Sequence, residues 1–169
     1  MNTGQMLLAT GAMVLLGLTI VTVNRSYSTQ GAVLQNTEIG VYAVSLATSI
    51  VEEASGHAFD ESTVDDAVTS PNSMTAATSL GTETGETTSP SSTLQFDDFD
   101  DYNKLTLGFK VAGVDSFTVK CSVYYINPTA PDVMLSTQTF DKRLDVKVFG
   151  SMNQDTVKVS YIFSYFNFR

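Results

Sequence analysis

An uncharged, apolar stretch lies near the N-terminal end of this chain and limits the folds open to it. Met6 to Val23 reads MLLATGAMVLLGLTIVTV, with no ionisable side chain, and the first basic residue is Arg25. A helix rises about 1.5 Å per residue, so this stretch spans roughly 27 Å, close to the hydrocarbon core of a bilayer. Residues 1–25 are therefore predicted to form an apolar helix that lies in a membrane or in the core of an assembly of such helices.

Small residues interrupt this apolar stretch at intervals. Gly4 and Gly11 are seven residues apart and share a helix face, and Ala9 and Gly17 add two further small positions. Small side chains let two helices approach closely where apolar burial alone gives little specificity. These four residues are predicted to pack helices together, although an ordinary membrane helix also contains glycine.

The charges around the apolar stretch are unlike those of a secretory signal peptide. The leading residues MNTGQ contain no lysine or arginine, and no small-x-small site closes the stretch. Arg25 would by itself favour placing the C-terminal side inside the cell, whereas the rest of the chain looks extracellular. Two explanations stay open, namely a mature form whose basic leader has been removed, or insertion by a dedicated machine.

A second helical pattern follows in residues 26–56. Apolar side chains recur there at helical spacing and form one stripe, which is predicted to pack on a sheet: Ile39, Ala43, Leu46 and Ile50. The polar residues 24–29 between the two patterns are compatible with a continuous helix, a kink or an extended linker.

The remaining sequence changes from loop to strand. Residues 57–103 form a Ser/Thr-rich and acidic region, and half of the positions from Ser62 to Thr93 are serine or threonine, as expected for a loop. Residues 104–169 contain alternating apolar and polar side chains, which predicts three or four antiparallel strands. A loop is expected at residues 127–132, which contain Pro128 and Pro131, and a turn at residues 150–154. The predicted fold class is α+β, with a long N-terminal helix, apolar in its first half and amphipathic in its second, packed on a C-terminal antiparallel β-sheet.

Charge and composition exclude several classes of function. The chain carries 18 acidic and 9 basic residues, a net charge of −9, which argues against binding nucleic acid. The lone Cys121 and the lone His57 are not part of any nucleophile elbow, phosphate loop or zinc motif. We therefore expect no enzymatic activity and no organic cofactor.

One acidic run stands out, Phe96-Asp97-Asp98-Phe99-Asp100-Asp101-Tyr102-Asn103. Closely spaced oxygen ligands suit Ca²⁺, although the run is not an EF-hand loop. Four adjacent aspartates repel one another, so solvent, Lys104, a basic patch such as Lys142-Arg143, or a metal must offset them. Two interpretations stay open, a solvated or salt-bridged loop and a Ca²⁺ site. The candidate ligands are Asp97, Asp98, Asp100, Asp101 and Asn103.

The layout as a whole resembles the type IV pilin-like superfamily, which comprises pilins, pseudopilins and minor pilins. The run SLATSIVEEA from Ser45 to Ala54 is similar to the helix end of some minor pilins, and DDFDDYN is similar to an acidic segment that follows it. The segments 142–149 and 156–163 resemble the last two strands. Gln5 stands where the family usually has a glutamate that pairs with the terminal amine of the neighbouring subunit, and the proline that often kinks the helix is absent.

This resemblance implies a structural subunit of an extracellular helical filament, similar to a type IV pilus, that assembles through the apolar helix with Gln5 among its packing residues. Its partners would be copies of itself and an inner-membrane assembly machinery. The subunit would lie in the cytoplasmic membrane before assembly and at the cell surface afterwards. Adhesion, motility, secretion and DNA uptake are all open as roles. The alternative is a membrane-anchored pseudopilin or binding domain of a secretion or surface complex that forms no long filament.

Overall fold

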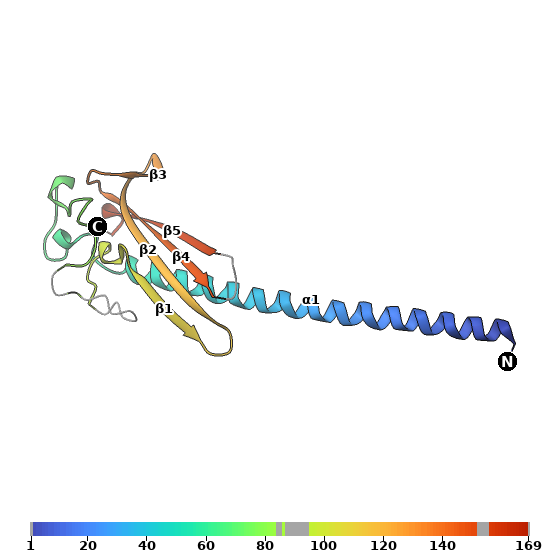
Figure 1. The fold of residues 1–169 in the computed structure, drawn as a ribbon. Coiled ribbons are helices and arrows are strands. Elements are labelled where there is room, and N and C mark those ends of the chain that lie inside the picture. Colours follow the sequence, from blue (N-terminus) through green and yellow to red (C-terminus); the bar gives the residue numbers. More distant parts are fainter. Residues whose placement is uncertain (1, 84–85, 87–94, 152–155, 169) are drawn as a thin grey trace. The chain divides into compact units, whose positions relative to one another are not determined.

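The computed structural model of the chain describes residues 2–83, 86, 95–151 and 156–168 (Figure 1). The backbone forms two compact units, residues Met1–Glu38 and residues Ile39–Arg169. The first unit is helical, and the second contains the remainder of the same helix together with a β-sheet and its loops.

A single helix, α1, runs from Thr3 to Ser55. It is continuous through residues 24–29, so the structure has neither a break nor an extended linker between the two predicted helical patterns. Threonine hydroxyls along α1 donate to the carbonyl four residues earlier, as Thr19 Oγ1 does to Leu15 O at 2.7 Å and Thr22 Oγ1 to Leu18 O at 2.8 Å. Because these hydroxyls are bonded within the helix, they do not require water around it.

The second unit is built on one antiparallel sheet. Four strands lie in the order β1 (Thr106–Val111), β2 (Asp115–Asn127), β4 (Asp141–Gly150) and β5 (Thr156–Ser164), and β3 (Ala130–Leu135) pairs with β2. The predicted α+β fold, with the long helix packed against an antiparallel sheet, is confirmed.

The sheet has one more strand than the alternation of apolar residues predicted. The segment after Asn127 was expected to be a loop because it contains Pro128 and Pro131, yet β3 begins at Ala130. Asn127 Oδ1 accepts a hydrogen bond from the backbone N–H of Thr129 at 3.0 Å and closes the turn. Proline is tolerated in β3 because this short strand pairs only with β2 among the described residues.

The core lies between the sheet and the last third of α1. Of the four residues predicted to pack on the sheet, Ile39, Ala43 and Ile50 are buried and Leu46 is half-buried. Ala47, beside Leu46, is fully buried. On the strands the period of two places alternate side chains in this core, and Val119, Cys121 and Val123 of β2 face it opposite Val148, Val146 and Leu144 of β4.

The described part of the Ser/Thr-rich region contains two short 3₁₀ turns, Glu61–Thr63 and Pro71–Ser73, and otherwise irregular backbone. Met74 and Leu80 anchor it by inserting into the core. The remainder of this region, residues 84–85 and 87–94, lies outside the described residues, as do residues 152–154 of the turn expected at residues 150–154.

Candidate functional site

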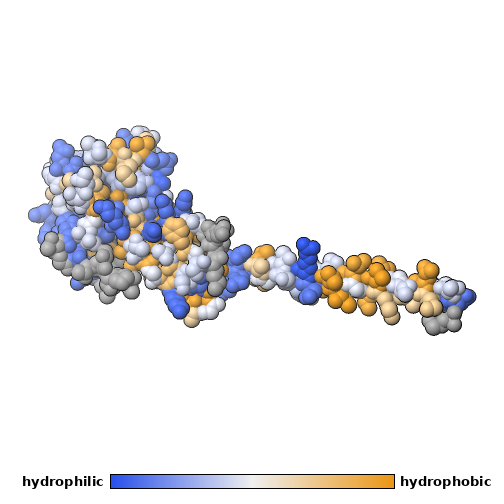
Figure 2. Space-filling model, viewed as in Figure 1, coloured by the Kyte–Doolittle hydropathy of each residue, from blue (hydrophilic) through white to orange (hydrophobic). Residues whose placement is uncertain are grey.

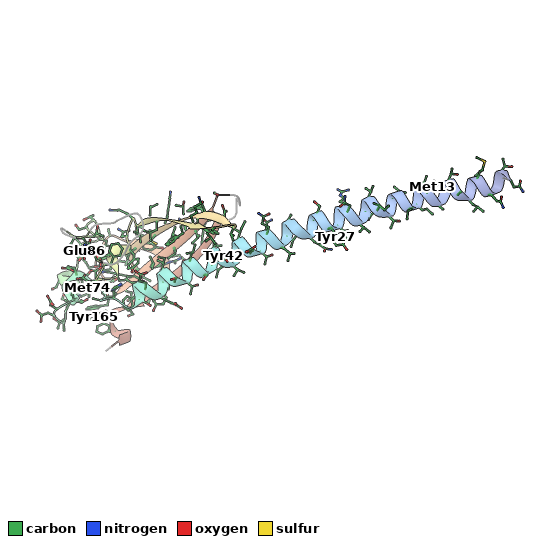
Figure 3. All side chains as sticks on the ribbon, turned by 90° about the horizontal axis from the view of Figure 1, so that it is seen from below. Met13, Tyr27, Tyr42, Met74, Glu86 and Tyr165 are labelled. Carbon is green, nitrogen blue, oxygen red and sulfur yellow. The ribbon has the colours of Figure 1, made fainter. Side chains whose placement is uncertain are left out.

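The first half of α1 has every described side chain exposed within its own unit. Leu7 is 77% exposed and Leu15 is 67% exposed. Figure 2 shows hydrophobic residues along this half of the helix, and in Figure 3 the side chains of Met13 and Tyr27 point outward from it. By length and composition α1 could cross a membrane. An apolar surface of this extent is typical of a segment covered by lipid or by another protein chain.

The predicted packing residues all lie on this exposed surface. A Cβ atom built at any of the three glycines would meet no atom within 4 Å, so the backbone there is open to a neighbour. Gln5 lies in the first turn, and its backbone N–H donates to the carbonyl of Asn2 at 2.9 Å. The exposed residues of this set are Gly4, Gln5, Ala9, Gly11 and Gly17.

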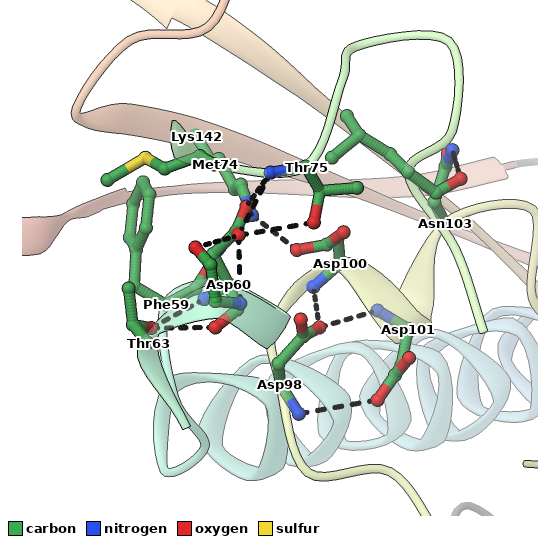
Figure 4. Close-up of polar contacts among 12 residues, drawn as sticks. Phe59, Asp60, Thr63, Met74, Thr75, Asp98, Asp100, Asp101, Asn103 and Lys142 are labelled. Atoms are coloured by element: carbon green, nitrogen blue, oxygen red, sulfur yellow. Dashed lines mark hydrogen bonds and ion pairs between the residues drawn. The ribbon is translucent and has the colours of Figure 1, made fainter. Parts of the chain in front are cut away.

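The second unit contains a buried lysine, Lys142, near the start of β4. It shares a strand face with Leu144 and Val146, and its side chain is fully buried. Its Nζ atom donates to the carbonyl of Phe59 at 2.8 Å, to Oδ2 of Asp60 at 2.7 Å, and to Oδ1 of Asp100. Figure 4 shows these contacts, which join three segments that are far apart in the sequence.

Aromatic rings cover the ammonium group of Lys142. It lies 4.7 Å from the centre of the Phe59 ring and 5.3 Å from that of Tyr125. A cation over the face of a desolvated ring is stabilised by roughly 1–2 kcal/mol. The rings thus offset part of the cost of burying the charge, and the two carboxylates offset most of the remainder.

Asp60 is the most extensively bonded carboxylate in this cluster. It caps the short 3₁₀ turn after α1, where Oδ1 accepts from the N–H of Ser62 at 3.2 Å, and it also accepts from the N–H of Thr75 at 3.0 Å. The hydroxyl of Tyr125 donates to Oδ2 at 3.0 Å. Burial by itself would raise the pKa of Asp60, but Lys142 and these hydrogen bonds lower it to about 2.

Asp98 and Asp101 form a reciprocal turn around the 3₁₀ helix η3 (Asp100–Tyr102). Oδ1 of Asp98 accepts from the N–H groups of Asp100 at 2.7 Å and Asp101 at 3.1 Å, whereas Oδ2 of Asp101 accepts from the N–H groups of Asp97 and Asp98. Burial and the neighbouring Asp100 carboxylate raise the pKa of Asp98 to about 9. Burial likewise raises the pKa of Asp101, to about 7.

The five predicted Ca²⁺ ligands have different partners in the structure. Asp97 is exposed, Asp98 caps a turn and Asp100 contacts Lys142. Asn103 is occupied at both ends of its amide, because Nδ2 donates to Leu80 O at 2.8 Å and Oδ1 accepts from Val123 N at 3.1 Å. The structure instead brings Asp101 together with Glu83 and Glu86, which were not predicted.

Sequence reasoning missed these two glutamates, and it named Lys142 only as part of a basic patch that offsets the acidic run, not as a buried residue. The signal for Lys142 was its spacing of two from Leu144, which assigns it to the apolar face of β4. No comparable signal linked Glu83 and Glu86 to Asp101, because a contact between two irregular segments produces no repeating pattern in the sequence. Cys121 is buried in the core, and burial raises the pKa of its thiol to about 12, so it behaves as a small apolar side chain.

Comparisons with protein-family models, with curated proteins and with solved structures found no match to this chain.

Proposed function

We propose that this chain is a structural subunit of an extracellular helical filament, similar to a type IV pilus, and that it assembles through the apolar half of α1. The observation that carries the proposal is the exposure of every described side chain in residues 2–38, including the uncharged stretch from Met6 to Val23. Apolar surface in water costs about 25 cal/mol per Å², so this surface requires a cover. Lipid covers it before assembly and copies of the same helix cover it in the filament.

The small residues favour helix-to-helix contact as the final state. Gly4 and Gly11 lie seven residues apart on one face, and the space beside their backbone is open. A neighbouring helix can therefore approach along this face more closely than lipid chains require. Gln5 can accept or donate a hydrogen bond across such an interface, without the ion pair that a glutamate would form.

The second unit would form the filament surface. Its sheet is held together without disulfides, since Cys121 is the only cysteine of the chain. The subunit would be inserted in the cytoplasmic membrane first, and an inner-membrane assembly machinery would extract it. Its principal partner would be copies of itself.

A membrane-anchored pseudopilin is the second candidate, because α1 would span a bilayer equally well as an isolated helix. Mechanical shearing of cells separates the two functions. A filament subunit is released by shearing and sediments as fibres, whereas an anchored protein stays with the membrane fraction and dissolves only in detergent. Recovery of the chain solely from the membrane fraction would favour the pseudopilin.

A further inference from the structure

We infer that the carboxylates of Glu83, Glu86 and Asp101 form a binding site for a hard divalent cation, and that Ca²⁺ is the ion it fits best. One oxygen of each carboxylate lies within 4.8 Å of the others. Two oxygens bound to the same Ca²⁺ at about 2.4 Å can be up to about 4.8 Å apart, so the three side chains already have the dimensions of one coordination sphere.

An independent observation at Asp101 points to a ligand. This side chain is fully buried, and its Oδ1 atom has no hydrogen-bond donor among the described residues. Its other oxygen, Oδ2, accepts from the backbone N–H of Asp97 at 3.1 Å. It also accepts from the backbone N–H of Asp98 at 3.3 Å (Figure 4), and the two contacts together fix the direction of the carboxylate. A buried carboxylate oxygen without a donor is costly, and a bound cation removes that cost.

Glu83 and Glu86 supply the other two carboxylates of the proposed cation site. Oε2 of Glu83 is also buried and lacks a donor among the described residues. The backbone N–H of Glu83 donates to Oε2 of Glu86 at 3.1 Å and orients that carboxylate. Both side chains are half-buried, which leaves access for the ion and for the water molecules that would fill its remaining positions.

The charges around the cluster also favour a cation. In the described part of the chain none of the three carboxylates forms an ion pair, because Lys142 is engaged by Asp60 and Asp100. Three carboxylates this close repel one another strongly in a partly buried environment. A divalent ion would balance most of this charge.

The ligand set discriminates among metals. All three ligands are carboxylate oxygens, and the set contains neither the sulfur nor the nitrogen that zinc sites typically use. Ca²⁺ accepts six to eight oxygens in flexible geometry, whereas Mg²⁺ requires a near-ideal octahedron. With three protein ligands and water in the other positions, we expect a dissociation constant of about 10⁻⁴ to 10⁻³ M, as in extracellular modules.

The ion would tie the loop that holds Glu83 and Glu86 to the turn that holds Asp101. This role is independent of the proposed filament, because it concerns the folding of the second unit alone. It also differs from the site predicted from the acidic run, with which it shares only Asp101.

The test is calorimetric titration of CaCl₂ into the metal-free, full-length protein in detergent micelles. We expect one Ca²⁺ per chain, binding at least tenfold weaker in Glu83→Gln and in Glu86→Gln, and unchanged binding in Glu52→Gln. Glu52 is a matched control because it is an exposed glutamate on α1 outside the cluster. Both cluster glutamates are half-buried, so their glutamine variants keep the fold, which circular dichroism checks.

Thermal unfolding gives a second measurement on the same samples. Ca²⁺ should raise the unfolding temperature of the wild type and of Glu52→Gln, and should raise that of Glu86→Gln by less than half as much. The inference is overturned if the folded wild type binds no Ca²⁺ up to about 10 mM, well above the affinity of extracellular Ca²⁺ modules. It is also overturned if Glu83→Gln and Glu86→Gln bind the ion as tightly as the wild type does.

Discussion

The ammonium group of Lys142 contacts the carboxylate of Asp60 at 2.7 Å, and both side chains are fully buried. Asp60 follows the end of α1, whereas Lys142 lies on β4, and Asp100 of η3 completes the contact. One buried positive charge therefore holds the loop after the helix, the acidic turn and the sheet together. The stability of this contact depends on all three charged side chains, because removing any one of them leaves a buried charge without its partner.

Lys142→Met tests this dependence. The substitution keeps most of the side-chain volume but leaves Asp60 and Asp100 buried without the cation, so we expect the free energy of unfolding to fall by about 3–5 kcal/mol. Chemical denaturation of the full chain in detergent measures the change. The matched control is Lys147→Met, at an exposed position of the same strand, which should change stability by less than about 0.5 kcal/mol. Equal effects at the two positions would contradict a central role for Lys142.

The pH dependence of stability tests Asp60. Its ordinary pKa is 3.8, and the folded protein lowers this pKa to about 2. The ionised form is thus favoured by folding, and its contribution is complete above about pH 5 and is lost as the pH falls through the folded pKa of about 2. The shift corresponds to stabilisation on the order of 2 kcal/mol.

Asp60→Asn has a side chain of the same shape that cannot ionise in this range. We expect the stability of this variant to fall less steeply than that of the wild type between pH 4 and pH 2. Denaturation curves at four or five pH values measure the two slopes. Parallel slopes would show that Asp60 is not held ionised by its buried partners.

Ala47 tests the packing of the helix on the sheet. It is fully buried at the centre of the contact, so Ala47→Leu must displace neighbouring side chains, and we expect a loss of about 1–3 kcal/mol. Ser45→Leu adds the same side chain at an exposed position of α1 two residues earlier and should be nearly neutral. Thermal unfolding compares the two. A stable Ala47→Leu variant would mean that the helix and the sheet are more loosely packed than the structure shows.

Local patterns predicted most of the fold, and tertiary pairing accounts for what they missed. The uncharged stretch from Met6 predicted the first half of α1, and the apolar alternation of Leu144 and Val146 predicted β4. The same alternation includes Lys142, but a lysine at a core position is interpretable only when its carboxylate partners are known to lie nearby. Those partners are 42 and 82 residues away in the sequence, and no local period encodes such a separation.

The sequence of the acidic run likewise could not predict which partner each carboxylate contacts. Residue type alone treated Asp97 to Asp101 as equivalent candidate ligands. In the structure, backbone geometry assigns Asp98 to a turn and Asp100 to the lysine, and a loop pairing brings Glu83 to Asp101. Composition could identify the acidic region, whereas the assignment of each carboxylate required the fold.

Gly11 tests the proposed helix-to-helix contact. Gly11→Leu fills the open space beside the backbone, so we expect at least a tenfold loss of sheared fibres, measured by immunoblot of the sheared fraction. Leucine is a better helix former than glycine by about 0.5–1 kcal/mol and keeps the segment apolar, so loss of assembly would not reflect loss of the helix. Gly11→Ala, which stays small, is the matched control and should assemble. Fibre yields that are equal for the leucine variant and the wild type would rule out close packing at this position.

Electron cryomicroscopy of material sheared from cells that produce this chain is the most direct test of the proposed filament. The account predicts long, uniform helical fibres in which residues 6–23 of many copies pack together in a central bundle, with the β-sheet units outside. Fibres that lack these helices at their centre would contradict the account. So would the absence of fibres from cells whose membranes contain the folded protein.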